Sequence, residues 1–310
     1  MKSLPPAILL MGPTASGKTA LAVELVKRFP CDIISVDSAM IYRGMDIGTA
    51  KPSADILRIA PHRLIDILDP VENYSAGAFR RDALQHMQEI ASAGRVPLLV
   101  GGTMLYFHVL QRGIAELPEA NPQVRAELDA RAARDGWAAL HAELAQVDPE
   151  AAARIHPNDP QRIQRALEVY DTAGKPLSEL QRTGAVEAVP YRMIKFGLAP
   201  ADRSQLHARI GERFRAMMTA GFLEEVRQLS EEQGLTSQHA SMRSVGYRQL
   251  REFLDRGGSL ERAVERGIVA TRQFAKRQLT RLRAEPDVSW YDSDVPALLD
   301  RVTRVLEDRL

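Results

Sequence analysis

The residues best suited to chemistry form one segment near the start of the chain, GPTASGKT at 12–19. Its spacing matches the phosphate-binding pattern G-x-x-x-x-G-K-[ST], and it lies between an apolar run and a helical pattern. Gly12 and Gly17 allow the backbone to aim N–H groups at phosphate oxygens. Lys18 can reach the terminal phosphates, and Thr19 can offer its hydroxyl to Mg²⁺. The segment therefore predicts a site for a diphosphate or triphosphate, without saying which.

Two more predicted strand ends carry side chains that could act on a ligand in that site. Asp37 follows the apolar run DIISV, and Thr103 follows Gly101-Gly102 after VPLLV. Ligands of parallel α/β sheets bind outside the carboxyl ends of the strands, so both residues are expected beside the phosphate loop. Asp37 could accept a proton or hold Mg²⁺ through water, and Thr103 could stabilise a leaving-group oxygen. Two plainer alternatives stay open, a capping Asp and a Thr that caps a simple turn.

These side chains need a sheet to position them, and strand and helix patterns alternate through residues 6–118. That alternation predicts an α/β fold with a parallel sheet flanked by helices. Residues 121–184 are helical and Ala-rich, and a later strand returns the chain to the sheet before further helices over 201–283. We therefore predict a core of residues 1–118 and 189–310, interrupted by an all-α insertion of residues 119–188. The strands are expected at Ala7–Met11, Asp32–Val36, Arg63–Ile67, Val96–Val100 and Arg192–Leu198, and the helices of the two parts at Lys18–Phe29, Ala76–Ala93, Pro122–Asp135, Gly136–Gln146, Pro149–Ile155 and Asp159–Ala173.

Composition excludes several classes of protein. With 45% hydrophobic and 26% charged residues, the chain is typical of a soluble globular protein and unlike a disordered or fibrous one. Its apolar runs are far shorter than the ~20 residues of a membrane span. The first apolar run leads straight into the phosphate loop, which is untypical of a cleaved signal peptide. The single Cys31 cannot form an intrachain disulfide. We therefore expect a cytoplasmic protein with no membrane segment.

The net charge of +1 hides a segregation of charge along the chain. Residues 201–283 carry 16 basic and 10 acidic side chains, whereas residues 284–310 carry 3 and 7. Within the basic stretch, TRQFAKRQLTRLR at 271–283 contains no acid. A solvated charged face is the alternative explanation of such a run. The absence of any carboxylate favours contact with a phosphate backbone.

The spacing of the basic residues in this segment suggests which side of a helix they occupy. Arg272 and Lys276 are four residues apart, as are Arg277 and Arg281, which predicts adjacent rows on one side. Three apolar side chains are then expected to face inward, namely Phe274, Leu279 and Leu282.

The motifs together resemble those of one enzyme family, the bacterial tRNA dimethylallyltransferases. The resemblance covers nearly the whole chain, and the motifs occur in the family's order. The matching segments are GPTASGKT at 12–19, VDSAMIYRGMDIGTAKP at 36–52, HRLIDI at 62–67, YSAGAFRRDA at 74–83, PLLVGGTMLY at 97–106, IHPNDPQRIQRALE at 155–168, SMRSVGYRQ at 241–249 and TRQFAKRQLTRLR at 271–283.

The resemblance implies a nucleotide-kinase-like phosphate-loop fold with an inserted helical domain that grips the anticodon arm of tRNA. It also implies Mg²⁺-dependent transfer of a dimethylallyl group from dimethylallyl diphosphate to N6 of the adenosine 3′-adjacent to the anticodon. Asp37 would be the general base, Thr103 would assist diphosphate departure, and a monomer is expected. The implied diphosphate-binding residues are Gly12, Pro13, Thr14, Ala15, Ser16, Gly17, Lys18, Thr19 and Arg213, with Thr19 also on the metal. The implied tRNA contacts are Asp37, Ser38, Ala39, Met40, Thr103, Arg125, Gln161, Arg162, Ile163, Gln164, Arg165, Met242, Arg243, Ser244, Val245, Gly246, Tyr247, Arg272, Lys276 and Arg277.

One residue departs from the family pattern, because Arg281 stands where the family usually has Trp. The change adds charge and removes a stacking ring at that position.

Three other functions share part of the sequence signal. A small-molecule kinase would share the phosphate loop and Asp37, and an isopentenyltransferase of free adenine nucleotides would share the chemistry. A non-catalytic RNA-binding protein could retain the loop as a ligand sensor.

Overall fold

The computed structural model describes residues 4–115, 117–183, 188–231 and 234–310. The chain divides into two compact units, which are described separately below. The larger unit consists of Met1–Leu110 and Pro190–Leu310, and the smaller one of Gln111–Val189. The smaller unit thus begins at Gln111, whereas the insertion expected from the sequence begins at residue 119. No helix in the described part of the chain is long and apolar enough to cross a membrane.

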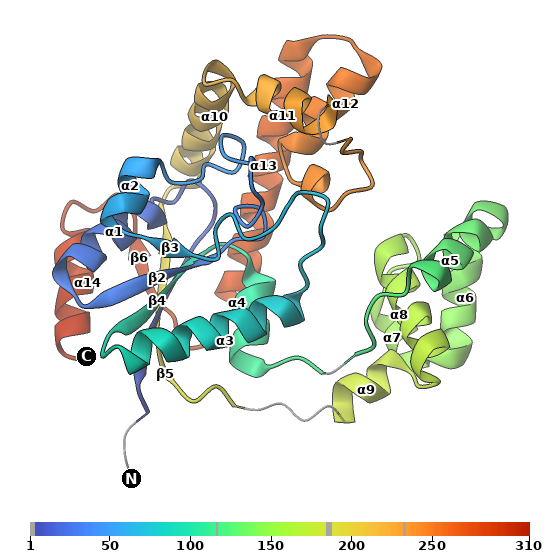
Figure 1. Ribbon diagram of the computed structural model, residues 1–310, viewed down its shortest axis with the longest axis horizontal. Coiled ribbons are helices and arrows are strands. Elements are labelled where there is room, and N and C mark those ends of the chain that lie inside the picture. Colours follow the sequence, from blue (N-terminus) through green and yellow to red (C-terminus); the bar gives the residue numbers. More distant parts are fainter. Residues whose placement is uncertain (1–3, 116, 184–187, 232–233) are drawn as a thin grey trace. The chain divides into compact units, whose positions relative to one another are not determined.

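The larger unit is built on a six-stranded parallel sheet with the order β3-β2-β4-β1-β5-β6 (Figure 1). The three adjacent inner strands β2, β4 and β1 are almost wholly buried, as expected for a parallel sheet that is covered on both faces. Because all strands run the same way, their carboxyl ends meet at one edge of the sheet. The strands are β1 (Pro6–Met11), β2 (Cys31–Val36), β3 (His62–Arg63), β4 (Val96–Gly101), β5 (Arg192–Ala199) and β6 (Ser289–Asp292).

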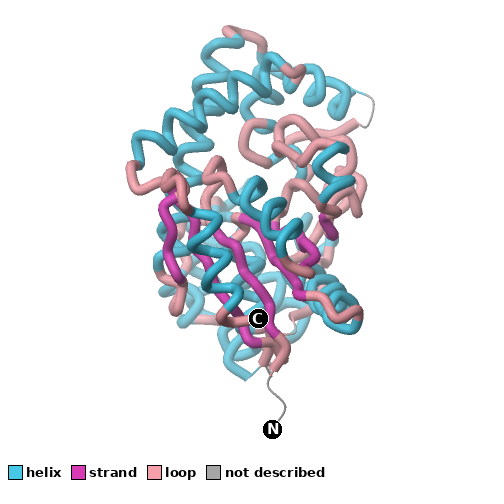
Figure 2. Tube along the Cα trace, turned by 90° about the vertical axis from the view of Figure 1, so that its left-hand side faces the viewer, coloured by secondary structure: helices cyan, strands magenta, loops and turns pink. Residues whose placement is uncertain are grey.

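Helices flank this sheet on both faces, as Figure 2 shows with the strands in magenta. Helix α1 packs on α14, and Leu25, Ile33 and Phe196 belong to the apolar cluster between these helices and the strands. Helix α3 packs against β2 and β4. The helices described in this unit are α1 (Lys18–Arg28), α2 (Ala54–Ile59), α3 (Ala76–Ser92), α4 (Met104–Arg112, which runs into the smaller unit), α10 (Arg203–Thr219), α11 (Phe222–Glu231), α12 (Tyr247–Arg256), α13 (Leu260–Arg283) and α14 (Leu298–Glu307), with a 3₁₀ turn at Ser241–Arg243.

A second apolar core joins helices α10 to α13. The ring of Phe222 contacts those of Phe214 and Tyr247 edge-on, at centroid distances of 5.9 and 4.9 Å. Glycines allow the close approach, because a Cβ on Gly48 or Gly267 would lie only 2.0 or 2.3 Å from a ring carbon of Phe222 or Phe214. This core fixes α10 and α13 against each other, and both helices carry residues of the site described below.

Two strands differ from the sequence-based prediction. The strand expected at Arg63–Ile67 is only His62–Arg63, because Leu64 and Asp66 adopt positive φ values of 62° and 56° that an extended strand does not permit. The edge strand β6 was not predicted from the sequence. It is four residues long and only partly buried, so it lacks the apolar run by which a central strand is recognised.

The smaller unit is all-α in its described part. Its helices are α5 (Pro122–Asp135), α6 (Trp137–Val147), α7 (Pro149–Arg154), α8 (Pro160–Ala173) and α9 (Leu177–Thr183). Side chains cap several of these helices, as expected for Asn and Asp at helix starts. Asn121 accepts from two backbone N–H groups of α5, and buried Asp148 accepts from Ala151 of α7 and also from the backbone and hydroxyl of Ser178. The four helices expected in this region are present, each within two residues of its predicted bounds.

Candidate active site

The phosphate loop connects β1 to α1 at the carboxyl edge of the sheet. Gly17 has φ 84° and precedes α1 without a capping side chain, so the helix N-terminus is left open to a ligand. Gly12 lies against β5, where a Cβ would meet the carbonyl oxygen of Leu198 at 2.3 Å. The loop therefore presents an uncapped helix N-terminus to an incoming anion.

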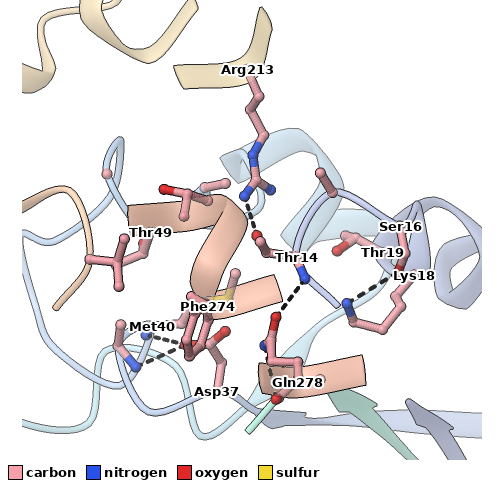
Figure 3. A pocket seen from close by; sticks show the side chains of 18 of the residues that line it. Thr14, Ser16, Lys18, Thr19, Asp37, Met40, Thr49, Arg213, Phe274 and Gln278 are labelled. Atoms are coloured by element: carbon pink, nitrogen blue, oxygen red, sulfur yellow. Dashed lines mark hydrogen bonds between the residues drawn. The ribbon is translucent and has the colours of Figure 1, made fainter. Parts of the chain in front are cut away.

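Two cations from distant parts of the sequence meet at this loop (Figure 3). The ammonium of Lys18 donates to the carbonyl oxygen of Pro13 at 2.7 Å, and the guanidinium of Arg213 in α10 donates to the hydroxyl of Thr14. Among the described residues, neither cation forms an ion pair with a carboxylate. The positions predicted for them beside the loop agree with the structure.

Burial disfavours the charged forms of both groups, and Arg213 adds repulsion at Lys18. Burial is the main cause that lowers the pKa of Lys18 to about 7, Arg213 lowers it further, and Asp37 opposes the shift. Burial also lowers the pKa of Arg213, again against the effect of Asp37. An anion placed between the two cations would offset both penalties. The electrostatics thus favour a phosphate-containing ligand at this place.

Asp37 follows β2 and lines the same cavity of about 750 Å³. Its Oδ1 accepts the backbone N–H groups of Ala39 and Met40 at 2.8 and 3.3 Å, which is the capping role considered as an alternative. Its Oδ2 makes no hydrogen bond to the described residues. One oxygen therefore fixes the turn that follows β2, while the other remains available as a base.

Thr103 follows β4 and reaches across to the residues after β2. Its hydroxyl accepts the backbone N–H of Ser38 at 3.1 Å, and its carbonyl accepts the N–H of Tyr106 at the start of α4. The residue thus begins a helix and also ties together two strand ends. Asp37 and Thr103, the two residues predicted to be catalytic, therefore both line one cavity.

Gln278 in α13 is a site residue that the sequence reasoning missed. Its Oε1 accepts the backbone N–H of Thr14 and its Nε2 donates to the carbonyl oxygen of Gly102, both at 2.9 Å (Figure 3). The side chain is only 6% exposed. A Cβ on Gly102 would lie 2.3 Å from Nε2, so the second strand-end glycine makes room for this amide. The sequence did contain one indication of this residue, a neutral amide one turn after Phe274. The segment was interpreted mainly from its charged residues.

The basic residues of α13 do not lie on one side of the helix, so the prediction of adjacent rows is wrong. Positions 272 and 277 differ by about 140° at 3.6 residues per turn. Arg277 lines the cavity with its guanidinium 5.9 Å from the centroid of the Phe274 ring. Arg272 turns toward α10 and donates to the carbonyl oxygen of His207 at 3.4 Å. Phe274, which was expected in the core, lines the cavity instead, and Lys276 is exposed.

Only part of the segment 242–247 can contact a ligand with its side chains. Met242 and Tyr247 are buried in the helical core, and Gly246 is also buried at the start of α12. The prediction that Met242 and Gly246 touch tRNA is therefore corrected, whereas Tyr247 also borders the cavity. The hydroxyl of Tyr247 donates to Glu225, which also accepts from three backbone N–H groups of the loop 46–48. The remaining members of the segment line the cavity, namely Arg243, Ser244 and Val245.

The predicted RNA contacts of the smaller unit divide in the same way. Ile163 is fully buried in its core, so a contact from this side chain is excluded. Arg125 and Arg165 both pair with the buried carboxylate of Glu168, at 2.8 and 2.7 Å. Gln164 donates to Asp129. Two further members of this set are exposed, Gln161 and Arg162.

Comparison with known proteins places this geometry in a family. The family model described as IPP transferase matches residues 40–285. The chain belongs to the IPP transferase family. It is 56% identical over 306 residues to the tRNA dimethylallyltransferase of Thioalkalivibrio sulfidiphilus, covering 98% of this chain and 96% of that protein.

Solved structures of this family have the same fold. The full-length tRNA isopentenylpyrophosphate transferase of Bacillus halodurans is 35% identical with a TM-score of 0.71, covering 98% of this chain and 96% of that one. The corresponding enzyme of Staphylococcus epidermidis is also 35% identical with a TM-score of 0.71, at 99% and 100% coverage. A eukaryotic dimethylallyltransferase acting on tRNA is 24% identical with a TM-score of 0.79, covering 97% of this chain and 78% of that one, and this likeness shows the fold.

Proposed function

We propose that this chain transfers a dimethylallyl group from dimethylallyl diphosphate to N6 of the adenosine 3′-adjacent to the anticodon of tRNA. The observation that carries the proposal is the pair of half-buried cations, Lys18 and Arg213, in one cavity with the half-free carboxylate of Asp37. A kinase-like loop alone would fit many phosphate esters. Membership of the IPP transferase family supports a prenyl diphosphate among them.

The reaction follows from the charges that these residues present. The bond between C1 of the dimethylallyl group and the diphosphate oxygen breaks, and its electron pair leaves on the diphosphate. Lys18, Arg213 and the loop N–H groups stabilise that developing charge. The N6 lone pair of adenine forms the new bond to C1, and the N6 proton passes to the free Oδ2 of Asp37.

Thr103 has a second task in this scheme. Its hydroxyl is fixed by the N–H of Ser38, beside the phosphate loop that Gln278 joins to the same strand end. The same hydroxyl donates to the Ser38 hydroxyl at 3.4 Å, and a rotation of its O–H bond would let it donate to an oxygen of the departing diphosphate instead. We infer that Thr103 assists departure while Gln278 keeps the loop and the strand end in register.

Mg²⁺ is the metal expected from the phosphate-loop pattern and from the family. The described residues contain no cluster of three or more His, Cys, Asp or Glu suited to a metal. Mg²⁺ commonly uses one or two protein ligands together with substrate phosphates and water, so the hydroxyl of Thr19 and a diphosphate fit such a site. The ion would supply positive charge that neutralises the leaving diphosphate.

The acceptor base must reach a cavity at the sheet edge, which requires it to leave the stack of the anticodon loop. Flipping a base out of its stack costs a few kcal/mol, and the cost is smallest for a base that is already single-stranded, as in a loop. Splayed single-stranded bases are also the usual targets of sequence-selective RNA recognition. The aromatic ring of Phe274 with Arg277 over it offers a stacking surface within the cavity.

One assay separates this function from its rivals. The protein is incubated with labelled dimethylallyl diphosphate, Mg²⁺ and either tRNA or AMP, without ATP. Label in tRNA supports the proposal, and label in AMP would assign the chain to the transferases of free nucleotides. Absence of label from both acceptors would contradict prenyl transfer and leave a kinase or a binding protein.

We further propose that the protein acts as a monomer in the cytoplasm, where its tRNA substrate is found.

A further inference from the structure

One carboxylate outside the cavity binds a segment of backbone that leads into the cavity wall. Glu225 lies in the first turn of α11 and accepts from the backbone N–H groups of three consecutive residues. Its Oε2 accepts from Asp46 and Ile47 at 2.9 and 2.6 Å, and its Oε1 accepts from Gly48 at 3.1 Å. The hydroxyl of Tyr247 in α12 also donates to Oε1. This set of hydrogen bonds is called the Glu225 clamp below.

The clamped segment continues directly into the lining of the cavity. Residues 48–50 line it, whereas Glu225 is not among the described residues that do so. Figure 3 shows Thr49 on the same side of the cavity as Asp37 and across from Lys18. Because the acceptor adenine must lie beside Asp37, this loop borders the place of the acceptor, and the diphosphate site lies on the other side.

The loop adopts a backbone shape that requires support from its surroundings. Ala50 has φ 56°, in the left-handed region that residues other than glycine seldom adopt. Such a conformation persists where surrounding contacts fix it. Residue 48 lies so close to α11 and α12 that a Cβ there would meet a ring carbon of Phe222 at 2.0 Å and one of Tyr247 at 2.6 Å. The Glu225 clamp therefore fixes the loop from two helices that lie far away in the sequence.

The same loop is tied to the turn that follows β2. The ammonium of Lys51 donates to the carbonyl oxygen of Tyr42 at 3.0 Å and pairs with Asp66. The backbone N–H of Asp66 donates to the carbonyl oxygen of Met40 at 3.2 Å, and the N–H of Met40 binds Asp37. A displacement of the loop would therefore also reach the turn that carries the proposed base.

We propose that Glu225 is a positioning residue for the transfer, holding the loop 46–52 as the wall against which the acceptor adenine is placed beside Asp37. The inference rests on the proposed function, because it takes an adenine of tRNA as the acceptor. Glu225 acts through the loop and touches neither substrate. Its loss should slow transfer within the bound complex, since a small misplacement of reacting groups is costly in rate. The diphosphate site should keep its affinity.

The variant Glu225→Gln tests the clamp at nearly constant side-chain volume. An amide has one acceptor oxygen where the carboxylate has two, so at least one N–H group of the loop must face an N–H₂ group. The single-turnover rate constant at saturating tRNA should fall by about tenfold or more. Affinity for inorganic diphosphate, measured by calorimetry, should stay unchanged.

The matched control is Glu224→Gln in the same turn of α11. Glu224 is exposed and pairs with Arg227 at the surface, at 3.6 Å. Both variants remove one negative charge from the start of the helix, so the control corrects for the interaction of that charge with the helix dipole. It should transfer at the wild-type rate.

Hydrogen exchange of the backbone N–H groups of residues 46–48 gives a readout that does not depend on activity. These groups should exchange faster in Glu225→Gln than in the wild type and in Glu224→Gln. Unchanged exchange, or a wild-type transfer rate in Glu225→Gln, would overturn the positioning role. Equal losses of diphosphate affinity and transfer rate would show that Glu225 only stabilises the fold and would overturn it too. Wild-type protein that transfers no prenyl group would refute the proposed function, whereas an active wild type with an equally active Glu225→Gln would refute only the clamp.

Discussion

Lys18 is the residue whose charge state most strongly governs the site. A lysine with a pKa of about 7 is half-neutral at neutral pH in the ligand-free protein. A bound diphosphate favours its charged form and raises that pKa. Binding must then take up a proton above pH 7 and weaken by up to about tenfold per pH unit.

Calorimetry of inorganic diphosphate binding at pH 8, in buffers of different ionisation enthalpy, measures this proton uptake. The same titration of Lys18→Met corrects for the ionisation of diphosphate itself. Proton uptake that is equal in the variant and the wild type would contradict the lowered pKa of Lys18.

Asp37 combines two roles that a pair of substitutions can separate. Asp37→Ala removes both the capping oxygen and the base, whereas Asp37→Asn keeps an oxygen that can accept from Ala39 and Met40. Both variants should lower turnover by roughly 10²-fold or more, a typical contribution of general base catalysis. Only Asp37→Ala should lose stability, by about 1 kcal/mol for a lost cap. Single-turnover rates and thermal melts measure the two effects, and near-normal turnover of Asp37→Asn would remove Asp37 as the base.

At the scale of elements, α13 connects the phosphate loop to the end of β4 through Gln278. Gln278→Leu would remove the partner of the half-buried N–H of Thr14 and leave the carbonyl of Gly102 buried without a partner, at a cost of about 1–3 kcal/mol for that buried group. We expect a lower free energy of unfolding in denaturant together with weaker binding of inorganic diphosphate. Gln273→Leu, an exposed position on the same helix, is the control and should change neither. Diphosphate binding that survives Gln278→Leu unaltered would show that the link is only structural.

For the whole molecule, the distribution of charge matters more than its sum. The net charge is +1, yet 201–283 is basic and 284–310 is acidic. If basic groups face RNA phosphates, tRNA affinity depends on the number of contacts and not on net charge. Six or more contacts would weaken binding by about 10³-fold or more between 50 and 200 mM salt. Filter binding over that range is the measurement, and a salt-insensitive affinity would contradict the phosphate contacts assigned to α13.

Local sequence determined the parts of this protein that depend on near neighbours. The strand–loop–helix from Pro6 to Arg28, helices α5 to α8 of the smaller unit and the strand-end positions of Asp37 and Thr103 followed from motif spacing and periodicity. These features are settled by contacts within one or two turns, by helix caps and by the burial of central strands. Arg213 was assigned to the site only by the resemblance, and the structure places its guanidinium beside Thr14.

Tertiary structure alone decided which side of each element meets the site. The cations of α13 divide between the cavity and α10, because α10 packs on one flank of that helix and the sheet edge lies at another. Ile163, Met242 and Tyr247 lie in cores for the same reason. Gln278 joins Thr14 across 264 positions of sequence, a pairing that no local pattern encodes. Sequence specified the chemistry of this site, and packing selected the side chains that reach it.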